Sequence, residues 1–377
     1  MQMEYIALKD VCKINMGQSP DSSSYNDNED GIPFFQGNAD FGERYPVTRV
    51  WCNAPTKIAQ PEDILISVRA PIGALNFAIE ECCIGRGLAA LTPDRSKVSL
   101  EFIYWLLKGK NAELNSKGTG STFKAISRKV LEDTRVPAID LGKQHEYAKI
   151  LEKTYSVIQN RREELSALDN LIKARFVELF GNCKEKCKLS EYAELITKGA
   201  SPRWQGVEYS DNEEGTLFVT SENVREGFID YSKRKYLPNE INDILPRSVL
   251  KRNDVLINIV NASIGRAAIY ESDDLANINQ AVALVRLKPD SLNLKFLLAF
   301  LNSDEAIRAY DYMKVGGDKA NLSLKNISDL QIPVADMSVQ NQFADFTKQV
   351  DKSKFAVQKA LEQEQLLFDS LMQKYFG

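Results

Sequence analysis

The chain has 377 residues, of which 44% are hydrophobic and 27% are charged, and its formal net charge is −4. This length is enough for two or three domains, and the composition excludes a chain that is disordered throughout. The slight acidic excess excludes a domain that binds nucleic acid through overall positive charge, so any such binding would have to use one face.

The first predicted elements are short strands at residues 64–68, 74–79 and 88–91, where apolar residues run between clusters of Gly, Pro, Asn and Ser. A helix is predicted at 99–108. Residues 143–180 contain neither proline nor glycine, and apolar residues recur there every seven positions. This pattern predicts one long amphipathic helix of the coiled-coil type.

The second half of the chain predicts a similar series of elements. Strands are predicted at 255–260 and 282–287, a helix at 292–301, and a second long helix in the stretch 335–376, which also lacks proline and glycine. The two long helices are antiparallel if their apolar seams meet; the alternative is two independent helical tails that join two copies of the chain. The residues expected to pack the long helices together are Leu151, Ile158, Leu165, Leu168, Ile172 and Phe176 in the first, and Val350, Val357, Leu361, Phe368 and Leu371 in the second.

Short motifs recur in the same order in both halves, and the repeat is far too long for a solenoid, so the sequence predicts a duplicated domain. Gly17-Gln18-Ser19-Pro20 corresponds to Gly199-Ala200-Ser201-Pro202, and Gln144 corresponds to Gln340. The predicted fold class is α+β, with two duplicated mixed α/β domains joined by two long antiparallel coiled-coil helices in a pseudo-twofold arrangement. The predicted segments are a first mixed domain at 1–140, a long helix at 141–181, a second mixed domain at 182–336 and a second long helix at 337–377.

Motifs of catalysis and metal binding are missing from the sequence. It contains no P-loop, no Gly-x-Gly-x-x-Gly, no Asp/Asn-Pro-Pro-aromatic motif of adenine methyltransferases and no Asp/Glu-x-Lys of common nuclease sites. The six cysteines form no Cys-x-x-Cys pair, and the single histidine, His145, excludes a zinc site built on histidines. We therefore interpret the chain as a binding protein without an active site.

The chain has no secretory signal pattern and no run of about 18 apolar residues, so a cytoplasmic protein is expected.

Polar and basic residues gather in loops at matching places in both halves. Arg, Asn and Gln are the side chains that read base edges, whereas Lys, Ser and backbone N–H groups bind phosphates. A single such loop is better explained as solvated surface, and Arg69 and Arg86 would be structural if they paired with Glu80 or Glu81. The recurrence of such loops in both halves favours DNA contacts for the group. The candidate DNA-binding residues are Arg69, Arg86, Lys117, Ser121, Thr122 and Lys124 in the first half, and Arg203, Trp204, Lys233, Arg234, Asn261 and Arg266 in the second.

Over essentially its whole length, the chain resembles the specificity (S) subunits of type I restriction–modification systems. The resemblance is carried by the order of the elements and by several short motifs. One feature departs from the family. A glutamate usually precedes the matched glutamine, but here Lys143 precedes Gln144 and Val339 precedes Gln340. The motifs are Gly17-Gln18-Ser19-Pro20, Arg69-Ala70-Pro71-Ile72-Gly73, Cys83–Leu91, Ile278–Leu284, and the pairs Pro137/Gln144 and Pro333/Gln340.

The resemblance implies a function that the residues alone do not establish. Each mixed domain would be a target-recognition domain that reads one half of a bipartite site in double-stranded DNA. The helices would set the gap between the halves and dock two modification (methyltransferase) subunits, with ATP-dependent restriction subunits as further partners. The chain itself would bind no cofactor, because S-adenosylmethionine, ATP and Mg²⁺ belong to the partner subunits. The alternative function is a coiled-coil structural adaptor without DNA specificity.

Overall fold

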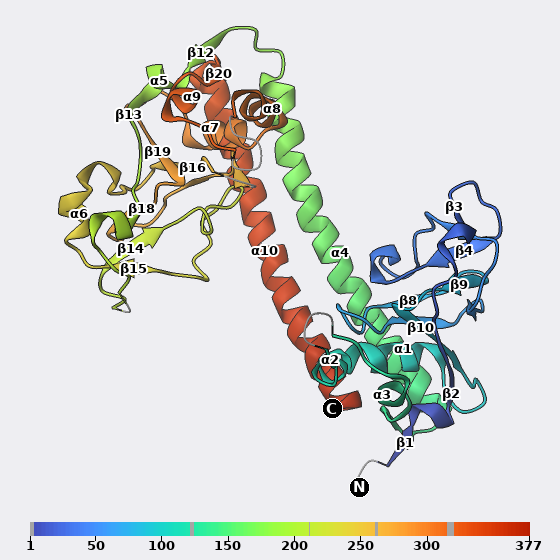
Figure 1. Ribbon diagram of the computed structural model, residues 1–377. Coiled ribbons are helices and arrows are strands. Elements are labelled where there is room, and N and C mark those ends of the chain that lie inside the picture. The colour runs from blue at the N-terminus through green and yellow to red at the C-terminus, as the bar shows by residue number, and fades with distance from the viewer. Residues whose placement is uncertain (1–3, 121–123, 211, 261–262, 315–319) are drawn as a thin grey trace. The chain divides into compact units, whose positions relative to one another are not determined.

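The structure is a computed structural model that divides into two compact units. Unit 1 comprises Met1–Arg162 and Lys359–Gly377, and unit 2 comprises Glu163–Gln358. Each unit combines sheets and short helices with part of both long helices (Figure 1). No helix in the described part of the chain is long and apolar enough to cross a membrane. The described residues are 4–120, 124–210, 212–260, 263–314 and 320–377.

The main sheet of unit 1 is antiparallel, with the strand order β2-β10-β7-β8. Successive side chains of a strand point to opposite faces, so Ile64 and Ile66 enter one core with Trp105, whereas Leu65 enters a second core on the other face. Apolar residues therefore run continuously through β7, because both of its faces are buried. The elements are β2 (Cys12–Met16), β7 (Ile64–Ser67), β8 (Leu75–Phe77), β10 (Leu88–Pro93) and the covering helix α1 (Leu100–Gly109).

A second sheet lies against the main sheet of unit 1, with the strand order β3-β5-β4-β9-β6. Its strands are short, and β4 and β9 pair in parallel although about fifty residues separate them. The elements are β3 (Tyr25–Asn26), β4 (Ile32–Phe35), β5 (Trp51–Cys52), β6 (Ile58–Ala59) and β9 (Cys82–Ile84). The remaining elements of unit 1 are the paired strands β1 (Tyr5–Ala7) and β11 (Arg135–Pro137), the helices α2 (Asn111–Ser116) and α3 (Arg128–Glu132), and the 3-10 turns η1 (Leu8–Asp10), η2 (Ser22–Ser24) and η3 (Asn38–Asp40).

Unit 2 repeats this topology, which confirms the predicted duplication. Its main sheet has the order β13-β19-β16-β17, strand for strand the order of unit 1, and it is also antiparallel. These strands are β13 (Ala193–Lys198), β16 (Val255–Asn258), β17 (Ala267–Ile269) and β19 (Val282–Leu287). The covering helices are α7 (Leu294–Leu301), α8 (Asp304–Met313) and α9 (Leu324–Ser328), and β12 (Lys186–Lys188) pairs with β20 (Gln331–Pro333).

The two units differ in the second sheet. The described residues of unit 2 form three strands there, in the order β15-β14-β18, and β14 and β18 pair in parallel as β4 and β9 do. The elements are β14 (Thr216–Val219), β15 (Tyr236–Leu237), β18 (Ala276–Ile278), α5 (Leu189–Tyr192), α6 (Ile241–Ile244), and the 3-10 turns η4 (Pro202–Gln205) and η5 (Pro246–Ser248).

The long helices α4 (Leu141–Phe180) and α10 (Met337–Phe376) have 40 residues each. In unit 1, Tyr147 stacks on Tyr375 with ring centroids 3.9 Å apart, and farther along α4 the Tyr155 ring lies 6.0 Å from that of Phe368. Residue numbers therefore rise along one helix while they fall along the other, so the helices run antiparallel in unit 1, as predicted (Figure 1).

The halves of the two helices within unit 2 run antiparallel as well. Asp169 forms an ion pair with Lys354, and farther along α4 the Phe176 ring lies 5.6 Å from that of Phe343. Among the residues expected to pack the long helices, six are buried: Leu151, Ile158, Phe176, Val350, Val357 and Phe368. The other five are partly buried: Leu165, Leu168, Ile172, Leu361 and Leu371.

A buried glutamine fixes the start of each long helix to the mixed part of its unit. Gln144 Oε1 accepts a hydrogen bond from the N–H of Ser99, the residue that caps α1, at 2.9 Å. Gln340 Oε1 accepts the same bond from the N–H of Asn293, which caps α7, also at 2.9 Å. A buried amide that satisfies a helix-terminal N–H in both repeats is a structural device, and it accounts for the matched glutamines of the sequence.

Candidate nucleic-acid interface

A tight turn between β9 and β10 presents Arg86 at the surface of unit 1. The N–H of Leu88 donates to the carbonyl of Gly85 at 3.0 Å, which closes the turn with Arg86 at its second position. The loop that begins at Gly17 lies against this turn so closely that a Cβ on Gly17 would come within 2.2 Å of the Gly85 carbonyl oxygen. Only glycine permits such an approach. The N–H of Arg86 donates to Ser19 Oγ at 3.3 Å, so the turn has a fixed base.

Backbone hydrogen bonds join this turn to Arg69 and Lys124. The N–H of Val68 donates to the carbonyl of Gly87 at 2.9 Å, and the N–H of Ala70 donates to the carbonyl of Lys124 at 3.0 Å. Three candidate cations that lie far apart in the sequence therefore stand on directly connected segments.

All three of these cations, Arg69, Arg86 and Lys124, have exposed side chains. None of the three charged groups forms a hydrogen bond or ion pair with another residue that the structure describes, so the alternative pairing with Glu80 or Glu81 is not observed. Lys117 differs, because its Nζ binds Glu113 Oε1 at 2.6 Å. Ser121 and Thr122 lie outside the described residues.

Unit 2 contains the same turn with a different side chain. The N–H of Val282 donates to the carbonyl of Asn279 at 3.2 Å, which puts Gln280 at the second position, where unit 1 has Arg86. The loop glycine is also matched, since a Cβ on Gly199 would lie 1.7 Å from the Ile278 carbonyl oxygen. Gln280 is exposed, and its amide has no partner among the described residues.

Gln280 was absent from the predicted contacts. The signal that could have found it is the alignment of Gly85-Arg86-Gly87-Leu88 with Asn279-Gln280-Ala281-Val282, each of which leads into a buried strand.

The other candidates of unit 2 stand in separate segments. Arg203 and Trp204 belong to η4, directly after the loop that begins at Gly199, and the Trp204 side chain is 82% exposed. An exposed indole offers a face on which a base can stack. Arg234 lies over the ring of Tyr231 at 5.6 Å, and Lys233 beside it is exposed. Arg266 is exposed as well, whereas Asn261 lies outside the described residues.

The described residues carry no group of three or more His, Cys, Asp and Glu side chains arranged to hold a metal ion. Burial raises the pKa of the Cys82 thiol to about 12, which leaves it protonated and unreactive at neutral pH. His145 lies exposed in the first turns of α4.

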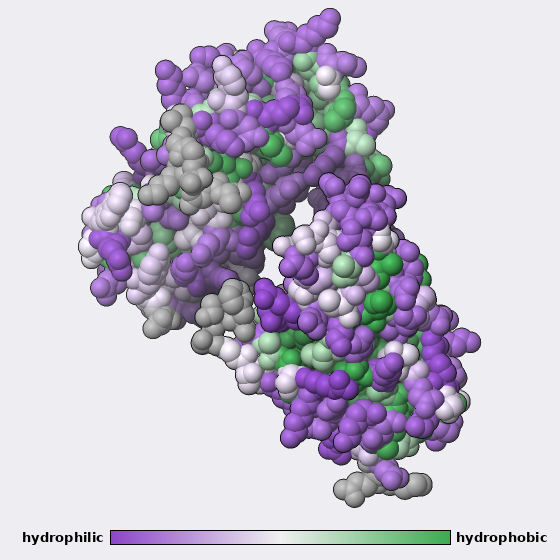
Figure 2. Space-filling model, turned by 45° about the vertical axis from the view of Figure 1, so that its right-hand side comes forward, coloured by the Kyte–Doolittle hydropathy of each residue, from purple (hydrophilic) through white to green (hydrophobic). Residues whose placement is uncertain are grey.

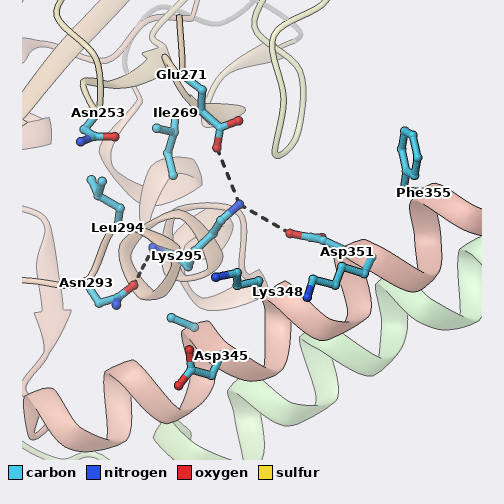
Figure 3. Close-up of a pocket in the computed structure, with 12 residues that line it drawn as sticks. Asn253, Ile269, Glu271, Asn293, Leu294, Lys295, Asp345, Lys348, Asp351 and Phe355 are labelled. Atoms are coloured by element: carbon cyan, nitrogen blue, oxygen red, sulfur yellow. Dashed lines mark hydrogen bonds and ion pairs between the residues drawn. The ribbon is translucent and has the colours of Figure 1, made fainter.

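A groove in unit 2 lies between α10, the start of α7 and the end of β17 (Figure 3). Lys295 stands across it, with its Nζ 3.5 Å from Asp351 and 3.9 Å from Glu271. The groove residues include three lysines and three carboxylates, so neither charge is in excess. They are Asn253, Ile269, Glu271, Asn293, Leu294, Lys295, Ala344, Asp345, Lys348, Asp351, Lys352 and Phe355.

Exposed apolar residues occupy matched places on the long helices. Leu171 on α4 and Leu367 on α10 follow Gln144 and Gln340 at the same distance along the chain, and they are 47% and 53% exposed. On the face that Figure 2 shows, hydrophilic residues cover most of the surface, and hydrophobic residues form smaller areas among them.

The family model of the type I restriction modification DNA specificity domain matches residues 2–169 and 204–366. A putative type I restriction enzyme MjaX specificity subunit of Methanocaldococcus jannaschii is 43% identical over 157 residues, which are 42% of this chain and only 37% of that relative. The type I restriction enzyme EcoBI specificity subunit of Escherichia coli is 23% identical over 411 aligned positions, covering 98% of this chain and 85% of the relative.

Solved structures show the same fold. An S subunit of a type I restriction–modification system from M. genitalium superimposes with a TM-score of 0.56 at 13% identity, covering all of this chain and 97% of the other. A chain from a study of complex assembly and conformational transition in a type I R-M system has a TM-score of 0.63 at 16% identity, covering 99% of this chain and 97% of the other.

Proposed function

The chain belongs to the type I restriction–modification DNA specificity family, and we propose that it is the non-catalytic DNA-recognition subunit of a type I restriction–modification complex. Each mixed domain, 1–140 and 182–336, reads one half of a bipartite site in double-stranded DNA. The long helices, 141–181 and 337–377, set the gap between the halves. The observation that carries the proposal is the duplicated turn, which presents a long polar side chain, Arg86 or Gln280, without an internal partner among the described residues.

Two modification subunits dock on the long helices in this proposal, and restriction subunits join them. The matched exposure of Leu171 and Leu367 supports two equivalent docking places, because two repeats can bind two copies of one partner in the same way. The partner subunits bind S-adenosylmethionine, ATP and Mg²⁺, and flip the target adenine out of the duplex before they methylate it. The complex works in the cytoplasm, where the DNA is.

The test is to express the chain with the modification subunits encoded beside it in a host that lacks other adenine methylation. Sequencing that detects methylated adenine should then find one bipartite motif with a fixed number of unread base pairs. The same subunits without this chain should leave that motif unmethylated. An assembled complex that binds DNA without any sequence preference would contradict recognition and favour the structural adaptor.

A further inference from the structure

The connected segments of unit 1 bring three uncompensated cations together. Arg69, Arg86 and Lys124 are exposed, and none of them pairs with a carboxylate among the described residues. Six other basic side chains of the mixed part of unit 1 do have such a partner: Arg44, Arg95, Lys97, Lys110, Lys117 and Arg128. Cations that satisfy no internal acid remain available to an external polyanion.

The matched segments of unit 2 carry no charge at the three corresponding positions. Gln280 takes the place of Arg86 in the turn. The antiparallel bridge between Arg69 and Ala125 in unit 1 is matched by a bridge between Val260 and Asn321 in unit 2.

This register puts Val260 at the place of Arg69, and Ala320, the residue before Asn321, at the place of Lys124. One backbone hydrogen bond is the same in both units, since Ile259 N–H donates to the Ala281 carbonyl at 2.9 Å just as Val68 N–H donates to the Gly87 carbonyl.

We infer that Arg69, Arg86 and Lys124 form a phosphate anchor that holds the DNA backbone at the first half-site, and that the matched described residues of unit 2, Val260, Gln280 and Ala320, form no such anchor. The inference rests on the proposed function. Phosphates are the only closely spaced negative charges that all DNA sequences share, and each cation that neutralises one releases counterions. The hydrogen bond from its N–H to Ser19 holds the backbone of Arg86 in place before DNA arrives, so only the side chain has to be ordered on binding.

Unit 1 therefore supplies electrostatic attraction at these three positions, whereas the three matched residues of unit 2, among them Gln280, are uncharged. The two repeats share one scaffold but differ at these three positions, where the contribution of the unit 1 cations is sensitive to salt and indifferent to sequence.

The test uses the full chain assembled with its modification subunits. Binding is measured across a sodium chloride series, on a duplex with the methylated motif and on a duplex with that motif scrambled. The triple variant Arg69→Val, Arg86→Gln, Lys124→Ala copies the residues of unit 2. The slope of log K against log salt should become shallower by about 0.9 for each cation removed, on both duplexes alike.

Arg95→Gln is the control, because it removes another exposed arginine of unit 1 that lies outside the anchor. It should leave the slope unchanged. The reverse exchange in unit 2, Val260→Arg, Gln280→Arg, Ala320→Lys, should build a similar anchor and make the slope steeper by a similar amount. An unchanged slope there would contradict a phosphate contact at this turn. The three single variants provide the same readout if a triple variant does not assemble.

An unchanged slope in a triple variant that unfolds at the wild-type temperature and binds its partners would overturn the anchor. A loss confined to one base pair of the first half-site, with the slope intact, would also overturn it, because the arginine concerned would then read a base. Failure of the proposed function is distinct: the wild-type complex would not discriminate between the motif and its scrambled version.

Discussion

The guanidinium of Arg44 is held between an acid and three rings in unit 1. Its Nη2 lies 2.7 Å from Glu152 Oε2 on α4, and its central carbon lies 4.7 Å from the ring centre of Tyr104 and within 6 Å of those of Phe77 and Trp105. One side chain therefore connects the loop before β5 to both the covering helix and the long helix.

Replacing Arg44 should destabilise unit 1. Arg44→Met removes the ion pair and the cation–π contacts and leaves Glu152 partly buried without its partner, so a loss of about 1–3 kcal/mol in the free energy of unfolding is expected. Urea unfolding of the full chain measures it. The exposed pair of Arg95 and Glu62 is the matched control, and Arg95→Met should cost well under about 1 kcal/mol. Equal effects of the two substitutions would contradict this account.

Lys108 should make the stability of unit 1 rise with pH. Burial and the nearby charge of Arg44 lower the pKa of Lys108 to about 8, and its Nζ lies 3.8 Å from the ring centre of Tyr155. The unfolded chain keeps this proton up to a pKa of about 10.4, so between the two values the unfolded state binds more protons and the stability contribution of Lys108 increases.

The measurement is the free energy of unfolding of wild type and of Lys108→Met at each pH. Taking the difference between the two cancels the contributions of all other titrating groups. The variant should be most stable relative to wild type below pH 8. Its relative stability should decline as the pH rises toward 10, because the wild type gains stability over that range. A difference that does not change over this range would show that Lys108 does not titrate with a lowered pKa.

Lengthening both long helices should change the gap between the half-sites and nothing else. One heptad inserted after Arg162 in α4 and one after Gln358 in α10 keeps the apolar seam in phase and adds about 10 Å, the rise of about three base pairs. Methylated-adenine sequencing should therefore find the same half-sites with about three more unread base pairs between them. A changed half-site with an unchanged gap would contradict the separation of reading from spacing.

Leu171 and Leu367 should each affect one modification subunit. Leu171→Asp and Leu367→Asp place a charge where an apolar contact is expected, so each variant should bind one partner subunit where the wild type binds two, as native mass spectrometry can count. Phe355→Asp is the control, since Phe355 is 73% exposed on α10 but its matched residue on α4 is the polar Gln159. Retention of both partners by both leucine variants would exclude this docking surface.

The sequence predicted the parts of the fold that local pattern determines. The long helices follow from the seven-residue spacing of apolar residues without a helix breaker, and β7, β10, β16 and β19 follow from short buried apolar runs between turn residues. The second sheet of each unit was not predicted. Strands such as β3 and β5 have two residues each, and the pairing of β4 with β9 joins distant segments through tertiary contacts that no local pattern reveals.

The sequence pointed to individual residues of the candidate interface but not to their arrangement in space. Exposed Arg69, Arg86 and Lys124 could be selected by residue type and loop position, but their connection depends on hydrogen bonds between three distant segments. Gln280 was missed because a glutamine before alanine has no distinctive chemistry until the turn shows that it occupies the place of Arg86.

The close approach of Gly17 to the turn at Gly85, and of Gly199 to that at Ile278, has a consequence for how such proteins diverge. No side chain can be added at either glycine without moving the neighbouring backbone, so the support beneath each turn tolerates almost no change. The second position of the turn points outward and already differs between the repeats, with arginine in one and glutamine in the other. A protein built in this way can acquire a new contact with DNA by a single substitution at that position while its folding stays untouched, so the DNA contacts of the two halves can evolve independently.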